Sequence, residues 1–231
     1  MEYETTLYSD IPFCTVHTAS DREGWLKMRK GLRGIGGSDA GTVYGVNKWK
    51  TPCQLWEEKT GRREPTELKS DAAEFGTKAE DHIRAIFALK NKHTYKVNYQ
   101  PHTIVQNNVN KFLLYSPDGL LEEIGTGRRG IWECKTTEIR KAAQFKDWDY
   151  AIPETYLCQI LHGHKTMPLT SFAVLTALIY KFGADEAEMR NYYIDFGDYI
   201  EAEEQLFQSE KEFFEKNIMQ DIQPADWLPG I

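Results

Sequence analysis

The sequence predicts an α/β or α+β fold, in which helices flank a central mixed β-sheet. Three features of the chain predict it: helical segments come first, a β-rich stretch interrupted by one helix follows, and an acidic helix closes the chain. With 231 residues, of which 41% are hydrophobic, the chain can bury a substantial core and lies within the size range of one elaborated domain. We therefore expect residues 1–231 to form a single domain.

The first predicted helix lies near the N-terminus. Ser20 and Glu23 have the spacing of a capping box, and apolar residues then recur at helical intervals, so the helix is expected to begin at Asp21 and to end at Gly31. The following run, G-L-R-G-I-G-G, is too rich in glycine to be regular. Ser38 then stands where the N-cap of the next helix would be.

Two further helices follow. Thr51-Pro52 places proline at the first position of a helix that Gly61 would end. A longer helix is expected from Asp71 to Lys90, because apolar residues recur along one side of it at Phe75, Ala79, Ile83, Ile86 and Phe87.

The middle of the chain is predicted to form strands. Residues 95–106 and 112–116 are rich in β-branched and aromatic types and are joined by the turn-forming run N-N-V-N-K. The loop E-E-I-G-T-G-R-R-G separates them from a strand at Ile131–Thr136, which suggests an antiparallel hairpin.

The last third of the chain alternates between the two types of structure. A helix is expected around Glu154–His164, followed by strand-like runs at 171–180 and 191–196. A final acidic helix covers about residues 198–217.

Charge is distributed unevenly along the chain. The formal net charge of −7, taken alone, counts against nucleic acid, because phosphate binding normally leaves a basic footprint. Residues 24–50, however, carry six basic residues and one acidic residue, whereas residues 185–221 carry twelve acidic and three basic residues. Such asymmetry permits one phosphate-facing surface on an acidic protein. The alternative is that both segments are ordinary solvated faces.

The N-terminus has no basic leader, and no run approaches the roughly 20 apolar residues that span a bilayer. We therefore expect a soluble, intracellular protein. The four cysteines are widely separated and form no C-x-x-C pair, which argues against a zinc ribbon or a redox dithiol. They are expected to be reduced and mostly buried thiols.

Two short motifs carry the candidate chemistry: S-P-D-G, which contains Asp118, and E-C-K, which contains Glu133 and Lys135. Side chains at i and i+2 of a strand project from the same face, so Glu133 and Lys135 share one. In the predicted hairpin Asp118 lies beside them, because Pro117 and Gly119 break the first strand and turn Asp118 toward its exposed edge.

Two carboxylates close together suit Mg²⁺ or Mn²⁺, which prefer oxygen ligands. Such an ion polarises a phosphodiester and activates water, while Lys135 would orient that water and stabilise the transition state as a point charge. The pattern thus indicates a metal-dependent nuclease. The alternative is an ordinary exposed hairpin with a turn aspartate and a surface Glu/Lys pair, which is the more frequent meaning of this pattern taken alone.

Two more polar residues lie on helix faces that are otherwise apolar. Glu80 shares the inward stripe of its helix and is a candidate third metal ligand, with Gly76 leaving room for close approach; alternatively it is an edge residue that reaches water. Gln159 lies among apolar helical neighbours and needs a partner if it is buried. It either hydrogen-bonds the nucleophilic water or the backbone near the site, or makes a purely structural hydrogen bond.

Four motifs follow one another along the chain: G-x-x-x-E at Gly76–Glu80, S-P-D-G-L at Ser116–Leu120, E-x-K at Glu133–Lys135 and Y-x-x-Q at Tyr156–Gln159. In this order they resemble the lambda exonuclease and YqaJ-type viral recombinase family, within the PD-(D/E)xK nuclease superfamily. The resemblance covers roughly residues 25–164. It implies a restriction-endonuclease-like core, with the catalytic part at about residues 71–180.

The resemblance also implies roles for individual residues. Its metal ligands would be Glu80, Asp118, Glu133 and the backbone carbonyl of Cys134, with Lys135 as the catalytic lysine and Gln159 as a supporting residue. It implies two Mg²⁺ ions, with Mn²⁺ as a substitute. No iron–sulfur cluster is expected, because Cys134 lies inside E-x-K and Cys158 lies next to Gln159.

The N-terminal run W-x-x-x-R-x-G followed by a serine resembles the family's pocket for a 5′-terminal phosphate, here with Trp25, Arg29 and Ser38. An arginine pairs with phosphate oxygens, and a hydroxyl with amides at a helix N-terminus attracts an anion. The spacing between Arg29 and Ser38 is wider than in the family, so Arg33 is a candidate to share or replace Arg29. The phosphate-binding segment would cover about residues 20–61.

The function implied is a 5′→3′ exonuclease on linear double-stranded DNA that leaves 3′ single strands for an annealing protein. A homotrimeric ring around the duplex is implied as well, acting in the cytoplasm of a bacterial host and encoded by a phage or prophage. One alternative is a restriction-like or structure-specific endonuclease, against which the basic, glycine-rich segment counts. Another is a non-catalytic DNA-end-binding module, against which the complete set of catalytic residue types counts.

Overall fold

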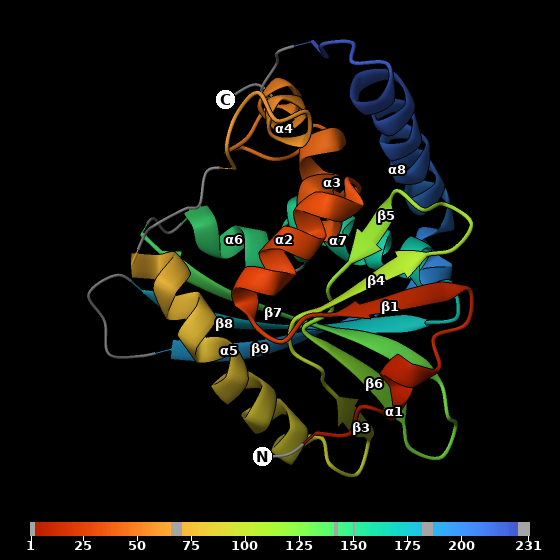
Figure 1. The fold of residues 1–231 in the computed structure, drawn as a ribbon. Coiled ribbons are helices and arrows are strands. Elements are labelled where there is room, and N and C mark those ends of the chain that lie inside the picture. The colour runs from red at the N-terminus through yellow and green to blue at the C-terminus, as the bar shows by residue number, and fades with distance from the viewer. Residues whose placement is uncertain (1–2, 66–70, 141–142, 150, 182–186, 226–231) are drawn as a thin grey trace.

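The computed structural model describes residues 3–65, 71–140, 143–149, 151–181 and 187–225, and Figure 1 shows their arrangement. The chain folds into two β-sheets with helices packed around them, so the prediction of a mixed sheet flanked by helices is confirmed. Among these residues no helix combines the length and the apolar character that crossing a bilayer requires.

The larger sheet has five strands in the order β3-β6-β7-β8-β9. Strands β7 and β8 are parallel, whereas every other neighbouring pair is antiparallel. Strand β7, which contains the E-C-K motif, is central and therefore paired along both sides. The strands are β3 Tyr95–Asn98, β6 Gly119–Glu123, β7 Arg129–Ile139, β8 Phe172–Lys181 and β9 Ala187–Asp195.

The smaller sheet has the order β1-β4-β5-β2. Its strands are β1 Cys14–Thr18, β4 Thr103–Asn107, β5 Leu113–Tyr115 and β2 Ile35–Gly36. The chain leaves this sheet after Tyr115 and enters the larger one at Gly119. Asp118 thus lies where the two sheets meet.

Two predictions about the strands were wrong. The hairpin partner of β7 is β6 rather than residues 112–116, which form β5 of the other sheet. Residues 95–106 form no single strand, since β3 and the start of β4 belong to different sheets. Pro117 and Pro101 explain both breaks, because each removes a backbone donor from the ladder.

The helices begin and end close to the predicted positions over most of the chain. They are α1 Thr6–Ser9, α2 Arg22–Leu32, α3 Gly37–Val43, α4 Pro52–Lys59, α5 Asp71–Lys90, α6 Ala143–Asp149, α7 Glu154–Thr166 and α8 Ile200–Glu212. A 3₁₀ turn, Phe196–Tyr199, precedes α8, and a π-helix, Phe213–Met219, follows it. Asp185 and Glu186 of the acidic stretch lie outside the described residues.

Three predicted helix ends were wrong by one or two residues. Asp21, not Ser20, is the N-cap of α2, because its carboxylate accepts the Gly24 N–H. Gly31 lies inside α2, which ends one residue later. Ser38 lies in the first turn of α3, whose N-cap is Gly36. Such shifts are expected, because capping residues close together compete for one helix end.

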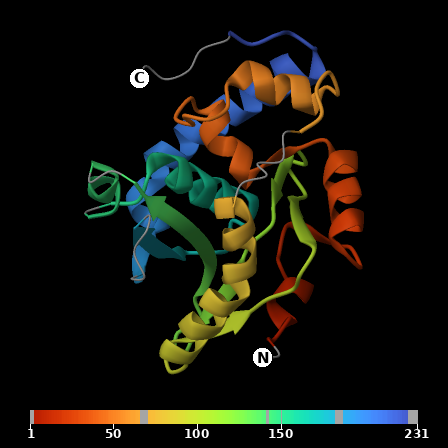
Figure 2. The same cartoon turned by 90° about the vertical axis from the view of Figure 1, so that its left-hand side faces the viewer.

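Helices cover the two faces of the larger sheet. On one face α5 packs against β7 (Figures 1 and 2), where Ile83 and Phe87 meet Trp132 in a buried cluster. On the other face α7 packs against β7 and also against α3, β5 and α8. The predicted apolar stripe of α5 is narrower than expected, since Phe75 and Ile86 are exposed.

Side chains along β7 point alternately to the two faces of the larger sheet. Trp132 and Cys134 belong to the cluster under α5, and Ile131 belongs to the cluster that includes α7 residues. Glu133 and Lys135 therefore lie on the α7 side, as the i and i+2 rule predicts.

Candidate active site

The carboxylate of Glu133 lies at the centre of the candidate site. It is only 1% exposed, and both of its oxygens accept hydrogen bonds. Lys135 Nζ lies 2.6 Å from Oε1, which also accepts a hydrogen bond from the Gln159 amide, and the Tyr115 hydroxyl donates to Oε2. Donors from β5, β7 and α7 thus fix its orientation, and a buried carboxylate requires such partners.

Asp118 lies next to Glu133 at the junction of the sheets. Its Oδ2 accepts a 2.8 Å hydrogen bond from the backbone N–H of Cys134. Burial and the charge of Glu133 raise the pKa of Asp118, while Lys135 and the Cys134 N–H act in the opposite direction. The three motif residues that the sequence singled out are therefore brought together.

Lys135 is a half-buried cation. Burial lowers the pKa of its ammonium group, but the carboxylates of Glu133 and Asp118 outweigh that effect, so the pKa lies above its usual value. The side chain is thus protonated at neutral pH and acts as a hydrogen-bond donor.

Glu80 approaches the site from α5. A Cβ on Gly76, one turn earlier, would lie 2.7 Å from Oγ1 of Thr136, so only glycine allows α5 to pack this closely on β7. Burial raises the pKa of Glu80 to about 7, with the charge of Asp118 adding to the effect and Arg84 opposing it. Its carboxylate is bonded to the guanidinium of Arg84.

A metal ion would require these carboxylates to share it. Among the described residues no group of three or more His, Cys, Asp or Glu side chains is arranged as metal ligands. Each carboxylate is held by protein donors instead. The donor set still fits a hard divalent cation, because all its side-chain ligands are oxygens. Burial, together with the charge of a neighbouring carboxylate, raises the pKa values of Glu80 and Asp118, and a bound cation would stabilise their charged forms.

A cleft of about 450 Å³ connects this cluster with the N-terminal segment. Its lining includes Glu80, Asp118 and Gln159 together with Arg29 and Ser38. Glu133 lies directly behind the wall, since it is bonded to Gln159 and to Tyr115, which also lines the cleft.

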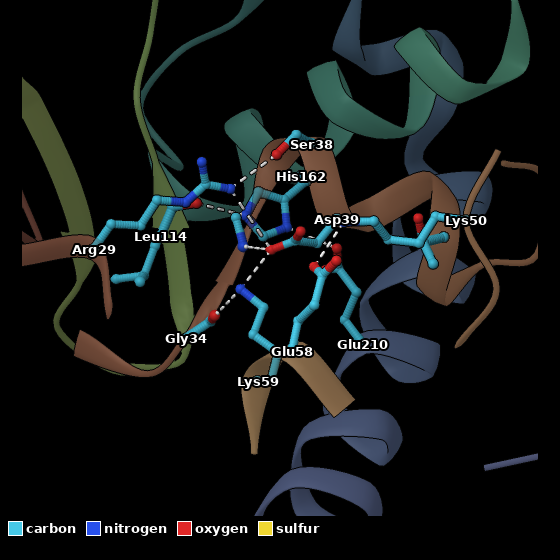
Figure 3. A network of polar contacts seen from close by, with 12 residues as sticks. Arg29, Gly34, Ser38, Asp39, Lys50, Glu58, Lys59, Leu114, His162 and Glu210 are labelled. Atoms are coloured by element: carbon cyan, nitrogen blue, oxygen red, sulfur yellow. Dashed lines mark hydrogen bonds and ion pairs between the residues drawn. The ribbon is translucent and has the colours of Figure 1, made fainter. Parts of the chain in front are cut away.

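Arg29 and Ser38 come together as the sequence predicted. Arg29 donates a 3.0 Å hydrogen bond to the Ser38 hydroxyl (Figure 3). Its guanidinium lies 5.4 Å from the Trp25 ring centroid. Arg33 differs: it is exposed at the C-cap of α2 and is not among the residues that line the described cleft.

Two residues of the site were missed by the sequence analysis. Tyr115 directly precedes S-P-D-G, but its bond to Glu133 depends on the pairing of distant segments. Arg84 is 0% exposed, donates a 2.8 Å hydrogen bond to the carbonyl of Asp118 and pairs with Glu80. Its position four residues after Glu80 on an inward helix face was a signal that could have found it.

The four cysteines are free thiols, three of them buried, as expected. Burial raises the pKa of Cys158 to about 12, which makes this thiol unreactive.

The fold is shared with solved nuclease structures. An alkaline exonuclease (LHK-Exo) from Laribacter hongkongensis superposes with a TM-score of 0.63 at 17% identity, covering 86% of this chain and 93% of that one. The structure of LHK-Exo in complex with dAMP gives 0.54, also at 17% identity, over 86% and 98% of the two chains. A phage-related exonuclease from Haemophilus somnus 129PT gives 0.53 at 11% identity, over 82% and 96%. The fold therefore defines a protein with the architecture of these exonucleases.

The sequence itself identifies the family. The YqaJ-like viral recombinase domain matches residues 24–166, and the chain belongs to this family. The uncharacterized protein YqaJ of Bacillus subtilis (strain 168) is 34% identical over 208 residues, which are 88% of this chain and 59% of that protein. This chain thus spans little more than half the length of that curated relative.

Proposed function

We propose that this protein is a divalent-metal-dependent 5′→3′ exonuclease that digests one strand of linear double-stranded DNA and leaves 3′ single-stranded overhangs. One observation carries the proposal: a single cleft is lined by Arg29 and Ser38 and by the carboxylates Glu80 and Asp118. A terminal phosphate bound to the first pair would hold the adjacent phosphodiester near the second. An endonuclease has no need of an end-binding pair at this place.

The proposed metal ligands are Glu80, Asp118, Glu133 and the carbonyl of Cys134, for two Mg²⁺ ions with Mn²⁺ as a substitute. When bound, the ions supply Lewis-acid polarisation of the phosphodiester and neutralise charge on the leaving oxygen. The protein contributes Glu133, which three donors hold in one orientation, so its position is set before substrate arrives.

Lys135 acts as a donor rather than as a base, because its ammonium group is protonated at neutral pH. From its place 2.6 Å from Glu133 it orients the attacking water and stabilises the negative charge on the phosphoryl oxygens. Gln159 has a supporting role, since its amide fixes the same Glu133 oxygen that Lys135 contacts.

In the same cleft, Arg29 binds the 5′-terminal phosphate through its guanidinium and Ser38 donates its hydroxyl. Arg29 is about one-third exposed, so it can reach a ligand. Proteins of the same fold support the proposal of an exonuclease. LHK-Exo and the phage-related exonuclease are both named as such, and LHK-Exo was also solved in complex with dAMP.

A substrate panel tests the function. The protein is incubated with Mg²⁺ or with EDTA and with 5′-phosphorylated linear duplex, 5′-hydroxyl duplex, closed circular plasmid and single strands. We expect rapid Mg²⁺-dependent loss of nucleotides from phosphorylated ends only, read with 5′ and 3′ labels. Equal cutting of closed circles would establish the endonuclease alternative, and end binding without cleavage would establish the non-catalytic module.

The phosphate pocket has its own test. Arg29→Ala and Ser38→Ala are expected to reduce the preference for a 5′ phosphate about tenfold or more, because each removes a hydrogen bond to a charged group. Arg33→Ala is the matched control, since it removes the same charge from the same helix outside the cleft. Equal effects of Arg29→Ala and Arg33→Ala would contradict the assignment.

The family resemblance supports three wider proposals: a homotrimer that encircles the duplex, delivery of the 3′ strand to a single-strand annealing protein, and action in the cytoplasm of a bacterial host on behalf of a phage or prophage. Light scattering after gel filtration tests the first. A protein that is strictly monomeric at micromolar concentration would contradict the proposed ring.

A further inference from the structure

Behind Arg29 and Ser38 lies a buried carboxylate that the exonuclease chemistry does not use. Asp39 is 6% exposed and follows Ser38 in the first turn of α3. Its Oδ2 accepts a 2.9 Å hydrogen bond from the Gly36 N–H and lies 2.6 Å from Nζ of Lys59. Figure 3 shows Asp39 and Lys59 close to the Arg29–Ser38 pair.

Asp39 also competes for Arg29. The Arg29 nitrogen that donates to Ser38 lies 3.9 Å from the same Asp39 oxygen. A carboxylate so close to a phosphate pocket repels an anion and attracts the arginine that should bind it. Lys59 removes this conflict, because it makes the shorter ion pair and leaves the three groups with one net positive charge.

Lys59 does not touch the cleft itself. It comes from α4, is not among the residues lining the described cleft, and donates a second hydrogen bond of 2.8 Å to the carbonyl of Gly34. It thereby connects α4 to the strand and helix that carry Gly36, Ser38 and Asp39. Burial raises the pKa of Asp39, but Lys59 and Arg29 outweigh that effect and hold it well below its usual range, so the carboxylate is charged at neutral pH.

We propose that Lys59 and Asp39 are positioning residues for recognition of a 5′-terminal phosphate: Lys59 neutralises Asp39 so that Arg29 remains on Ser38 and available to the phosphate. The inference rests on the proposed function of the Arg29–Ser38 pair and deepens it. When the charge of Lys59 is removed, Asp39 loses its shorter ion pair and draws the Arg29 guanidinium, 3.9 Å away, from Ser38 and from the cleft. The loss then appears in the binding of phosphorylated ends and not in the chemical step.

The experiment compares 5′-phosphorylated with 5′-hydroxyl duplex in two measurements. Fluorescence anisotropy in EDTA gives the ratio of the two Kd values, and cleavage in Mg²⁺ gives kcat and KM for each end. For Lys59→Met we expect the phosphate preference to fall about tenfold, with KM for phosphorylated ends rising and kcat unchanged, since one unit charge near the phosphate is lost. Lys165→Met is the control: it removes one charge and a 2.9 Å ion pair with Glu204, at a position that does not line the cleft.

A second variant separates positioning from folding. In Asp39→Asn/Lys59→Met the buried pair is replaced by neutral groups, so Arg29 has no competing carboxylate and the preference should return toward that of the wild type. Lys59→Arg retains the positive charge and should therefore keep most of the preference for a 5′ phosphate. Circular dichroism shows which variants fold; if Lys59→Met does not, the double variant and Lys59→Arg carry the test.

The outcomes distinguish this inference from the proposed function. If the wild-type protein shows no preference for a 5′ phosphate, both the assignment of the Arg29–Ser38 pair as a phosphate pocket and the inference about Lys59 and Asp39 are wrong. A wild type with the preference and a Lys59→Met variant that keeps it overturns the inference alone. So does a double variant that loses the preference as fully as Lys59→Met, because that result would mean a merely structural pair.

Discussion

Replacement of Arg84 by methionine tests how the active site is supported. The guanidinium is 0% exposed and donates a 2.8 Å hydrogen bond to the carbonyl of Asp118. It also pairs with Glu80 and with Asp81 at 2.5 Å, and it lies 3.4 Å from the ring centroid of Tyr99. Arg84→Met removes these contacts at once while keeping an apolar stem of similar length.

The size of the effect follows from the surroundings of each partner. The Asp81 side chain is 78% exposed, so that pair contributes less than about 1 kcal/mol. Glu80 is 32% exposed, and losing the charged hydrogen bonds to it and to the Asp118 carbonyl costs about 1.5–3 kcal/mol each. Stacking on Tyr99 adds about 0.5–2 kcal/mol, and the buried methionine recovers part of the loss. We expect a net decrease in the free energy of unfolding of about 3–5 kcal/mol.

Urea unfolding in EDTA at pH 7 measures this decrease, and Mg²⁺-dependent cleavage of phosphorylated duplex measures its consequence for Glu80 and Asp118. Arg84→Lys should recover only part of the loss, because lysine lacks the planar fork that serves several acceptors. The control is Lys96→Met, which breaks a 2.9 Å pair with Glu122 at the protein surface and should hardly change the stability, because solvent screens such a pair. An Arg84→Met variant as stable as Lys96→Met would refute the reasoning.

Three further predictions concern other contacts. Asp118→Ala and Lys135→Ala should abolish cleavage but retain cooperative unfolding, and turnover equal to the wild type in either would remove its catalytic role. Tyr115→Phe removes a donor to Glu133 and should cost about 1 kcal/mol in urea unfolding and about tenfold in kcat, so an unchanged kcat would contradict the orienting role. Burial lowers the pKa of His162, but the adjacent Glu210 outweighs it, so the pKa lies above its usual value. The stabilisation from this pair is therefore full below about pH 6.5 and is lost as the pH rises through the native pKa. The difference in unfolding free energy between the wild type and His162→Gln should shrink between pH 6 and pH 9, and a constant difference would contradict this.

Local signals predicted most helices correctly. Thr51 and Pro52 define the start of α4 because both the cap and the fixed proline φ act within one turn. The range predicted for α5 is the range observed, because its periodicity extends over five turns. Strand pairing was harder, since β5 and β6 are separated by only three residues and yet belong to different sheets. Nothing in the local pattern distinguishes a short strand in one sheet from a short strand in the other.

The packing of Tyr115, the last residue of β5, depends on contacts with distant parts of the chain. A Cβ on Gly37 would lie 2.8 Å from its ring and one on Gly163 would lie 2.7 Å from it, so α3 and α7 both approach β5 closely at a glycine. Gly37 and Tyr115 are far apart in the sequence, and their contact exists only after the sheets and helices have assembled.

The sequence by itself determined the residue types of the site and the shared face of Glu133 and Lys135, because alternation along a strand is a property of the local backbone. Tertiary structure decided which distant groups complete that site. Tyr115 and Gln159 reach Glu133 from two other elements, and Arg29 and Ser38 share a cleft with Asp118. Such contacts depend on how closely the helices and sheets pack. That distance is set by the volumes and shapes of all the side chains in the core, so the spacing of residues within one segment does not predict it.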